Sequence, residues 1–298
     1  MELTGKRIII TGAARGLGKH MAIACVRSGA QVLLTATDRY ALEETVGEAQ
    51  AAVDQAVIHL ADVREPAQVD TIVHAAQRAF GGVDVLFNNA GIGTGSIRPD
   101  FWENPVEFWT ITDDDYRRFL QINTLAAVRL ACLVAPQLIS SGWGRIVNVT
   151  TSLSTMLFPG QAAYSVSKAG LEAITAVMAA DLAGTGVTAN VLAPGGPADT
   201  RMTMGVKVPP EALISADCMA APAVWLSSNA SDGVTAKRSR DQVGPDIAAG
   251  ASRARRGGAG RLDRIWRPDA RPRRRNAGAE AAMRPPWNLS RVLIASLT

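Results

Sequence analysis

The chain has 298 residues, of which 47% are hydrophobic and 19% charged, a composition typical of a globular protein that buries a sizeable core. No run approaches 18 apolar residues, so we expect no membrane span, and the first residues lack the apolar stretch of a signal peptide. Three cysteines, expected to be small core residues, and three histidines share no ligand spacing. This disfavours a metal site and indicates a reducing, cytoplasmic location.

The first predicted strand, residues 7–10, leads through a glycine-rich turn, residues 11–18, into a helical segment. Gly12 suits a tight turn, Gly16 lets the backbone approach a pyrophosphate, and Gly18 permits close packing of the helix on the strand. The free N–H groups at the start of such a helix attract phosphate. The order strand, glycine turn, helix therefore predicts a dinucleotide-phosphate site, with a merely flexible turn as the alternative.

The second predicted strand, residues 31–36, ends where a dinucleotide fold meets the adenosine ribose. A carboxylate there would accept from a 2′-hydroxyl, whereas an arginine suits a 2′-phosphate. The sequence has Ala36 or Thr37 at this point, and Asp38 follows slightly late. Arg15 and Arg39 could both face a phosphate. This pattern favours NADP over NAD.

The third and fourth predicted strands, residues 56–60 and 83–87, also end in polar residues. Asp62 could accept from an adenine amino group or could equally serve as a turn or helix-capping carboxylate. Residues 88–91, Asn-Asn-Ala-Gly, form either an edge that a ligand can approach or a loop that needs these residues for its backbone.

A long connection, residues 92–112, carries four aromatic side chains, namely Phe101, Trp102, Phe108 and Trp109. Connections of this length are often lids or binding loops, so we expect an apolar wall facing a substrate, with packing or a subunit contact as the alternative. The following predicted helix, residues 113–140, contains Asn123, which is unfavourable in a helix interior and therefore needs a reason.

The fifth predicted strand, residues 144–149, ends in three hydroxyl residues, 150–152, and is followed by Tyr164 and Lys168 on a helix. Tyr164 and Lys168 are four residues apart and therefore lie on the same face of a helix. A protonated Lys168 should lower the pKa of Tyr164 and make it a proton donor and acceptor. A sixth strand, residues 187–192, closes in Pro194 and Gly195. Strands and helices alternate throughout, which predicts an α/β fold with a doubly wound parallel sheet and helices on both faces.

With these motifs in order, residues 5–234 resemble the short-chain dehydrogenase/reductases, a family with a Rossmann-like sheet. The resemblance rests on Thr11-Gly12-x-x-x-Gly16-x-Gly18, Asn88-Asn89-Ala90-Gly91, Asn123, Tyr164-x-x-x-Lys168 and Pro194-Gly195. It implies an NAD(P)-dependent oxidoreductase that acts on an alcohol or a carbonyl. Tyr164 would be the general acid/base, Lys168 would lower its pKa and hold the nicotinamide ribose, and Asn123 would fix a water in a proton relay.

The implied cofactor-binding residues lie in the glycine turn, at the strand ends and on the catalytic helix. They are Gly12, Ala14, Arg15, Gly16, Leu17, Gly18, Thr37, Asp62, Val63, Asn89, Ala90, Gly91, Tyr164, Lys168, Pro194, Gly195 and Thr200. No metal is expected.

Two features depart from the family pattern. Where the family usually has its catalytic serine this chain has Thr151, and Ser152 follows one residue later. Either hydroxyl could donate to a substrate oxygen. We lean slightly to Ser152, because a freely rotating primary hydroxyl can be re-aimed by a small backbone shift. The connection between Gly91 and Asn123 is also longer than usual, which indicates an unusual substrate pocket.

The end of the chain differs in character from the rest. Residues 238–298 hold 14 arginines against 5 acidic residues and no clear period. Arginine clusters bind phosphates, but such a segment buries too little apolar area to fold alone. We therefore expect one domain, residues 1–237, followed by a poorly ordered tail, residues 238–298, and we do not expect nucleic-acid binding.

The leading hypothesis is hydride transfer between a nicotinamide cofactor and a small-molecule alcohol or carbonyl, by a homo-oligomer, either a dimer or a tetramer. The alternative is a dinucleotide-binding sensor or scaffold with little or no turnover. Asn123, Tyr164 and Lys168 favour the enzyme, whereas the missing serine and the atypical chain end favour the alternative.

Overall fold

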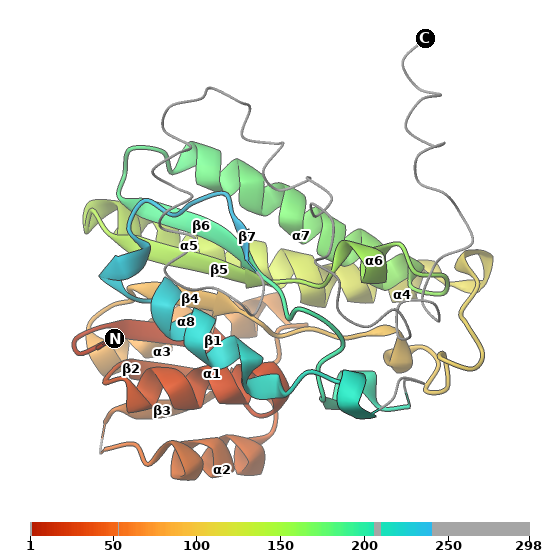
Figure 1. Cartoon of the computed structure of the whole chain (residues 1–298). Coiled ribbons are helices and arrows are strands. Elements are labelled where there is room, and N and C mark those ends of the chain that lie inside the picture. Colours follow the sequence, from red (N-terminus) through yellow and green to blue (C-terminus); the bar gives the residue numbers. More distant parts are fainter. Residues whose placement is uncertain (1, 53, 206–209, 240–298) are drawn as a thin grey trace.

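The computed structural model describes residues 2–52, 54–205 and 210–239, and the predicted tail beyond Ser239 lies outside these residues. Seven parallel strands form one sheet in the order β3-β2-β1-β4-β5-β6-β7 (Figure 1). The strands are β1 Arg7–Thr11, β2 Gln31–Ala36, β3 Ala56–Leu60, β4 Val85–Asn88, β5 Gly144–Val149, β6 Val187–Leu192 and β7 Arg238–Ser239. The predicted doubly wound parallel sheet is confirmed.

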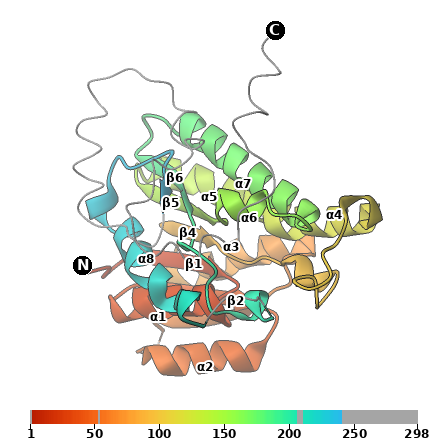
Figure 2. The ribbon, with the colours of Figure 1, turned by 45° about the vertical axis from the view of Figure 1, so that its right-hand side comes forward.

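Helices cover both faces of the sheet (Figure 2). The main helices are α1 Gly16–Arg27, α2 Arg39–Ala49, α3 Pro66–Phe80, α4 Asp113–Leu120, α5 Ala126–Ser140, α6 Leu153–Met156, α7 Ala162–Asp181 and α8 Ala220–Leu226. Side chains alternate along the strands: Ile8 and Ile10 pack with α1 and α8, whereas Ile9 packs with α3 and α5. Because both faces are covered, the inner strands are almost entirely buried and mainly apolar, although β5 and β6 also bury polar side chains such as Asn148 and Asn190.

The predicted helix over residues 113–140 is interrupted by one wide turn. Between α4 and α5, residues Gln121–Leu125 (η3) form a π-helical turn that contains Asn123. Such turns occur frequently at functional sites, and this one supplies the structural reason that Asn123 lacks in a regular helix. The run Asp113–Ser140 is long and apolar enough to cross a membrane, a test that core helices also pass, and Leu130 and Leu138 are buried in the core here.

Two details correct the sequence analysis. Cys25 is buried as expected, but Cys132 is exposed, because it falls on the outer side of α5. Arg238 and Ser239, assigned to the tail, instead form β7 and pair with Val191 and Leu192 of β6. A strand of two residues leaves no hydrophobic pattern in the sequence, so composition alone assigned it to the arginine-rich segment.

Candidate active site

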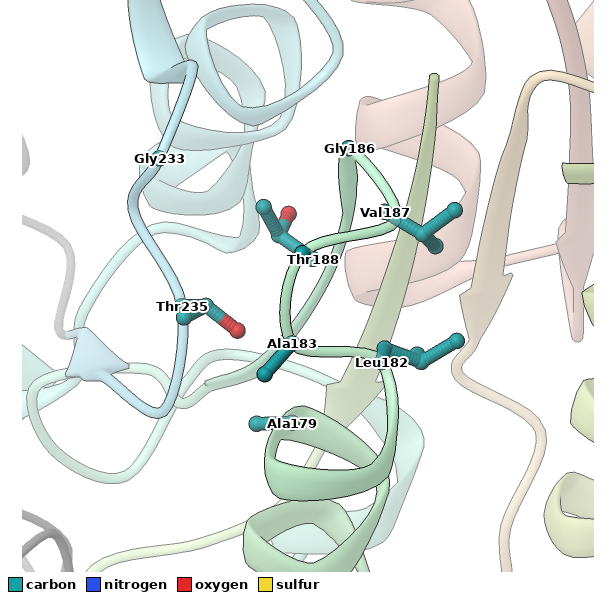
Figure 3. A pocket seen from close by; sticks show the side chains of 9 residues that line it. Ala179, Leu182, Ala183, Gly186, Val187, Thr188, Gly233 and Thr235 are labelled. Carbon is teal, nitrogen blue, oxygen red and sulfur yellow. The ribbon is translucent and has the colours of Figure 1, made fainter. Parts of the chain in front are cut away.

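The carboxyl ends of the strands carry nearly all the residues singled out from the sequence. In a parallel sheet these ends share one edge, and the strand order reverses between β1 and β4, where ligands of open α/β sheets bind. A pocket of about 210 Å³ lies elsewhere, at the amino end of β6, where Leu182, Thr188 and Thr235 line it (Figure 3). Small and apolar residues without a charged group make up its described lining. The candidate active site is therefore at the carboxyl ends of the strands and not in this pocket.

The glycine turn after β1 is packed so closely that side chains would not fit. Gly12 has φ +67°, and a Cβ there would lie 2.9 Å from Cα of Ala90. A Cβ on Gly18 would lie 2.2 Å from the carbonyl oxygen of Gly12 and 2.5 Å from Nδ2 of Asn89. The turn is thus pressed against both the start of α1 and the loop after β4, as the sequence predicted for Gly18.

Hydrogen bonds join the glycine turn to the loop after β4. The Thr11 hydroxyl accepts from the backbone N–H groups of Asn89 and Ala90, each at 3.0 Å. The Asn89 side chain donates in return to the carbonyl oxygens of Thr11 and Gly12. Asn89 therefore holds the two loops together, and its side-chain amide is committed to the protein.

The N-terminus of α1 fits the phosphates of a dinucleotide. Within the described residues, the side chain of Arg15, the N-cap residue, accepts no hydrogen bond from the first turn of α1. That turn also contains no acidic residue. Its leading N–H groups are thus free to meet an anion, which the helix dipole also favours. The glycines add no side chains of their own to this approach, and the side chain of Thr200 lies against Gly16.

At the predicted ribose end, Arg15 forms an ion pair with Asp38 at 2.8 Å. Both side chains are about half exposed, so the pair is worth at most ~1 kcal/mol and can be exchanged for a ligand. Asp38 also caps α2 by accepting from the N–H of Ala41. Thr37 is exposed beside them. The structure thus brings together a cation for a 2′-phosphate and a carboxylate for a 2′-hydroxyl.

At the end of β3, Asp62 is engaged by Arg64, which donates to both carboxylate oxygens through its side chain and backbone. This contact lowers the pKa of Asp62. The carboxylate therefore accepts hydrogen bonds within its own turn, as the second of the two interpretations of Asp62 predicts. Val63 follows it in the chain.

Tyr164 and Lys168 lie one turn apart on α7, and both are buried. Burial raises the pKa of the Tyr164 hydroxyl to about 12, and a hydrogen bond with the Thr151 side chain acts in the opposite direction. From its spacing in the sequence, Lys168 is expected to lower this pKa. The net direction is the reverse, because removing a phenolate from water outweighs the favourable contacts. Tyr164 therefore carries its proton at neutral pH.

Lys168 reaches from α7 to the end of β5. Its ammonium donates to the carbonyl oxygen of Val149 at 2.9 Å. Burial lowers its pKa to about 8, and the negative charge of Glu172 opposes that shift. Lys168 is still mostly protonated at neutral pH, so a positive charge faces the region beside Tyr164. A Cβ on Gly91 would lie 3.4 Å from its Nζ, which places the loop after β4 next to this charge.

The two candidate hydroxyls after β5 have different surroundings. Thr151 contacts the Tyr164 hydroxyl. Ser152 caps α6: its hydroxyl accepts from the N–H of Thr155 at 3.0 Å and shares hydrogen bonds with Ser154 and Thr155. The sequence slightly favoured Ser152 as the hydroxyl that donates to the substrate. This geometry favours Thr151 instead.

Asn123 joins the loop after β4 to α7. Its Oδ1 accepts from the N–H of Ile92 at 2.8 Å, and its Nδ2 donates to the Ile92 carbonyl and to the Ser167 hydroxyl. Both amide hydrogens are thus used by the protein, so the side-chain amide has none left for the water that the family resemblance implied. In the structure it holds the loop after β4 on α7.

The segment after β6 places Thr200 over the glycine turn. Pro194 and Gly195 follow β6 directly, and Thr200 begins a short 3₁₀ turn, η4 Arg201–Thr203. A Cβ on Gly16 would lie 3.1 Å from Cγ2 of Thr200. Two residues predicted to contact opposite parts of a dinucleotide therefore pack against one another.

The long connection divides its aromatic residues into two pairs. Phe101 is buried and stacks on Trp102 at 4.4 Å between ring centroids, and Trp102 lies 6.1 Å from Phe158 in the loop before α7. Phe108 and Trp109 are 66% and 73% exposed and contact one another edge to face. The first pair packs inside the molecule and the second faces outwards, so neither alternative from the sequence holds for all four.

Sequence reasoning missed two charged residues beneath this site, Glu172 on α7 and Arg238 on β7. Glu172 lies four residues after Lys168, a helical spacing that could have indicated it. Arg238 gave no such signal, because it precedes the arginine-rich segment without interruption.

Comparisons with known proteins agree with this geometry. A model of the short chain dehydrogenase family matches residues 6–209. The chain belongs to this family. A short-chain type dehydrogenase/reductase of Picea abies is 32% identical, over 79% of this chain and 90% of its own length. The NADPH-dependent aldehyde reductase-like protein of Arabidopsis thaliana is 34% identical, over 70% of this chain and 78% of its own length.

A solved structure, of a proposed short-chain alcohol dehydrogenase from Sinorhizobium meliloti 1021, superposes with a TM-score of 0.70. It is 26% identical and is matched over 83% of this chain and 98% of its own length. The family consists of oxidoreductases that use a nicotinamide cofactor, and the short-chain dehydrogenase fold accounts for the seven-stranded sheet found here.

Proposed function

We propose that this chain catalyses the NADP-dependent interconversion of a carbonyl compound and its alcohol, with Tyr164 as the general acid/base. The observation that carries the proposal is the protonated phenol of Tyr164, buried between Thr151 and the turn that holds Lys168. Carbonyl reduction needs a proton donor close to the bound cofactor. Tyr164 is buried at the carboxyl ends of the strands, the same end of the sheet as the glycine turn proposed to bind the phosphates.

The dinucleotide would be held by the glycine turn, the N-terminus of α1 and the loops after β4 and β6. When bound, the cofactor supplies a hydride to the carbonyl carbon. As the C–H bond forms, electrons of the C=O bond move to oxygen, and Tyr164 transfers its hydroxyl proton to that oxygen. Lys168 stabilises the phenolate left behind, and the Thr151 hydroxyl donates to the substrate oxygen while its charge develops. Solvent then reprotonates Tyr164. Oxidation runs through the same groups in reverse.

NADP is the preferred cofactor in this proposal. Arg15 is placed to pair with a 2′-phosphate, and the related Arabidopsis protein is named as NADPH-dependent. Asp38 works against this preference, because its carboxylate suits the 2′-hydroxyl of NAD. A charge-assisted contact to Arg15 should contribute on the order of 1.5–3 kcal/mol.

The activity is tested with a panel of aldehydes, ketones and secondary alcohols, followed by the absorbance of reduced nicotinamide with NADPH and with NADH. Cofactor affinities are titrated separately for the wild type, Arg15→Ala and, as a control, Arg117→Ala, whose exposed side chain lies on α4. We expect turnover, tighter binding of NADPH, and loss of that preference only in Arg15→Ala. Cofactor binding without turnover on any class of substrate would support the sensor or scaffold alternative instead. Equal affinities in the wild type would refute the NADP assignment.

We also propose that the chain forms a homo-oligomer through α5 and α7, which lie side by side. Large apolar side chains are exposed along these helices and the preceding π turn, including Leu125 at 53%, Val166 at 50% and Val177 at 49%. Exposed apolar groups gathered in this way mark association surfaces. Light scattering on the wild type and on Val166→Glu/Val177→Glu tests it, and a monomeric wild type would contradict the proposal.

A further inference from the structure

A carboxylate and a guanidinium are buried directly beneath the proposed catalytic residues. Glu172 on α7 and Arg238 on β7 pair at 3.0 Å, and their side chains are only 4% and 13% exposed. A buried ion pair is costly, since both charges leave water, and apolar residues of similar size would pack as well. The contacts that this pair makes therefore indicate what it does.

Every contact of the pair leads to the site. The Glu172 carboxylate accepts from the Thr150 hydroxyl at 2.7 Å as well as from Nε of Arg238. The other arm of Arg238, Nη2, donates to the carbonyl oxygen of Thr151. The two residues after β5 are thus fastened to α7, the helix that carries Tyr164. This fastening sets where the Thr151 hydroxyl lies relative to the phenol.

The pair also sets the charge around Lys168. The groups facing Lys168 are Tyr164 and Glu172 on its own helix and the Val149 carbonyl of β5, with Arg238 of β7 behind Glu172. The Glu172 charge favours the protonated ammonium and so opposes the burial that lowers the pKa of Lys168 to about 8. Arg238 carries the opposite charge, so we expect it to offset part of that effect.

We propose that Glu172 and Arg238 are positioning residues of the reaction: together they fix the Thr150–Thr151 segment against α7, and the charge of Glu172 holds Lys168 in its charged form. The proposal rests on the function proposed above. It assigns a role in the site to β7, the last described strand, and it separates Arg238 from the arginine-rich sequence that follows.

The charge part is tested with Glu172→Gln, which keeps the shape and an acceptor for Thr150 but removes the negative charge. Glu48→Gln is the matched control, since Glu48 pairs with Lys19 on the distant surface of α2. Two readouts are compared: the pH profile of kcat in carbonyl reduction, and the titration of Lys168 followed by NMR of ¹³C-labelled lysine, assigned with Lys168→Met. The NMR readout needs no turnover.

In Glu172→Gln, the NMR pKa of Lys168 should fall by about one unit, the lower end of the effect of a nearby opposite charge. The alkaline loss of kcat should move to lower pH by the same amount, because less Lys168 remains charged. Arg238→Met should shift the NMR pKa upwards, because Glu172 is then uncompensated, and should lower kcat at all pH values by loosening Thr151. Arg129→Met, which removes a surface ion pair with Asp70, is its control.

Opposite signs in the two variants are the result expected of a positioning role, and a merely structural pair gives no such pattern. A folded Glu172→Gln with the wild-type lysine titration would overturn the proposal, as would shifts of the same sign in both variants. If Glu172→Gln does not fold, the NMR pKa of Lys168 in Arg238→Met decides: a rise supports the proposal, and an unchanged or lower value overturns it. An inactive wild type refutes the proposed function only, because the NMR result still decides the role of the pair.

Discussion

In the proposed reaction, the Tyr164 hydroxyl gives up a proton from inside the protein. Burial raises its pKa to about 12, so the free protein presents a neutral phenol, the form that can donate a proton. Oxidation needs the phenolate, which is favoured only when the ammonium of Lys168 stabilises it. Oxidation therefore depends on the charge of Lys168 more than reduction does.

Replacing Tyr164 with phenylalanine removes this proton and little else. We expect kcat to fall by about 10²–10⁴-fold, the usual contribution of general acid/base catalysis, while cofactor affinity stays close to that of the wild type. Steady-state kinetics and a fluorescence titration measure the two quantities. Tyr116→Phe is the control for the chemical change. Full activity in Tyr164→Phe would contradict the assignment of the general acid.

The choice between the two neighbouring hydroxyls can be decided in the same assay. Thr151→Val keeps the shape of the side chain and removes the group that contacts Tyr164, so turnover should drop by about 10²-fold, the scale of one lost oxyanion donor. Ser152→Ala should cost instead ~1 kcal/mol of stability, because it deletes the N-cap of α6. The reverse pattern would move the catalytic role to Ser152.

Some residues of the candidate site were predictable from the sequence and others were not. The glycine turn, Tyr164 and Lys168 were predictable because their spacing along one element encodes their geometry. The pKa direction of Tyr164 was not, because burial depends on how α7 packs against the rest of the chain. The pairing of Glu172 with Arg238 was not predictable either, since the two are 66 residues apart and meet only through the order of the sheet.

On the scale of elements, the strands were predictable from apolar runs bounded by turn residues, and the alternation with helices fixed the parallel sheet. The π turn around Asn123 was only hinted at, because a change of hydrogen-bond register leaves the apolar pattern of the helix intact. The strand β7 was missed for a different reason. Its two residues pair with β6 through backbone groups, which every sequence possesses.

The junction of β1 and α1 gives a test at this scale. In Gly18→Ala the new methyl group would meet the Gly12 carbonyl and the Asn89 amide, so helix and turn must move apart. We expect a loss of stability of at least ~1–3 kcal/mol, typical of overpacking, together with loss of cofactor binding. Thermal unfolding and a binding titration measure both.

Gly47→Ala is the matched control for that substitution. Gly47 lies in the last turn of α2, and a Cβ there meets nothing within 4 Å. Alanine should therefore stabilise the protein by roughly 0.5–1 kcal/mol, because it favours the helical backbone, and cofactor binding should not change. Equal effects of the two substitutions would show that the close packing at Gly18 has no special role.

On the scale of the whole molecule, the proposed cofactor site joins parts of the chain that are far apart. The loops after β1, β4 and β6 belong to both halves of the sheet, so the site exists only when the sheet is complete. A ligand that bridges these loops binds the folded chain alone. Its binding free energy must then appear as added stability of the entire domain.

Thermal unfolding with and without NADP⁺ tests this coupling. At a free concentration of 100 times Kd the folded state gains about 2.7 kcal/mol, which for a domain of this size raises Tm by roughly 5–10 °C. NAD⁺ at the same concentration should give a smaller rise, because it lacks the phosphate that Arg15 would hold. In Gly18→Ala neither nucleotide should shift Tm, since the turn that would bear the phosphates is displaced. Tyr164→Phe should respond like the wild type, because its hydroxyl serves the reaction and not the binding. A wild type whose Tm is unmoved by either nucleotide would mean that the glycine turn and the α1 N-terminus do not form the cofactor site.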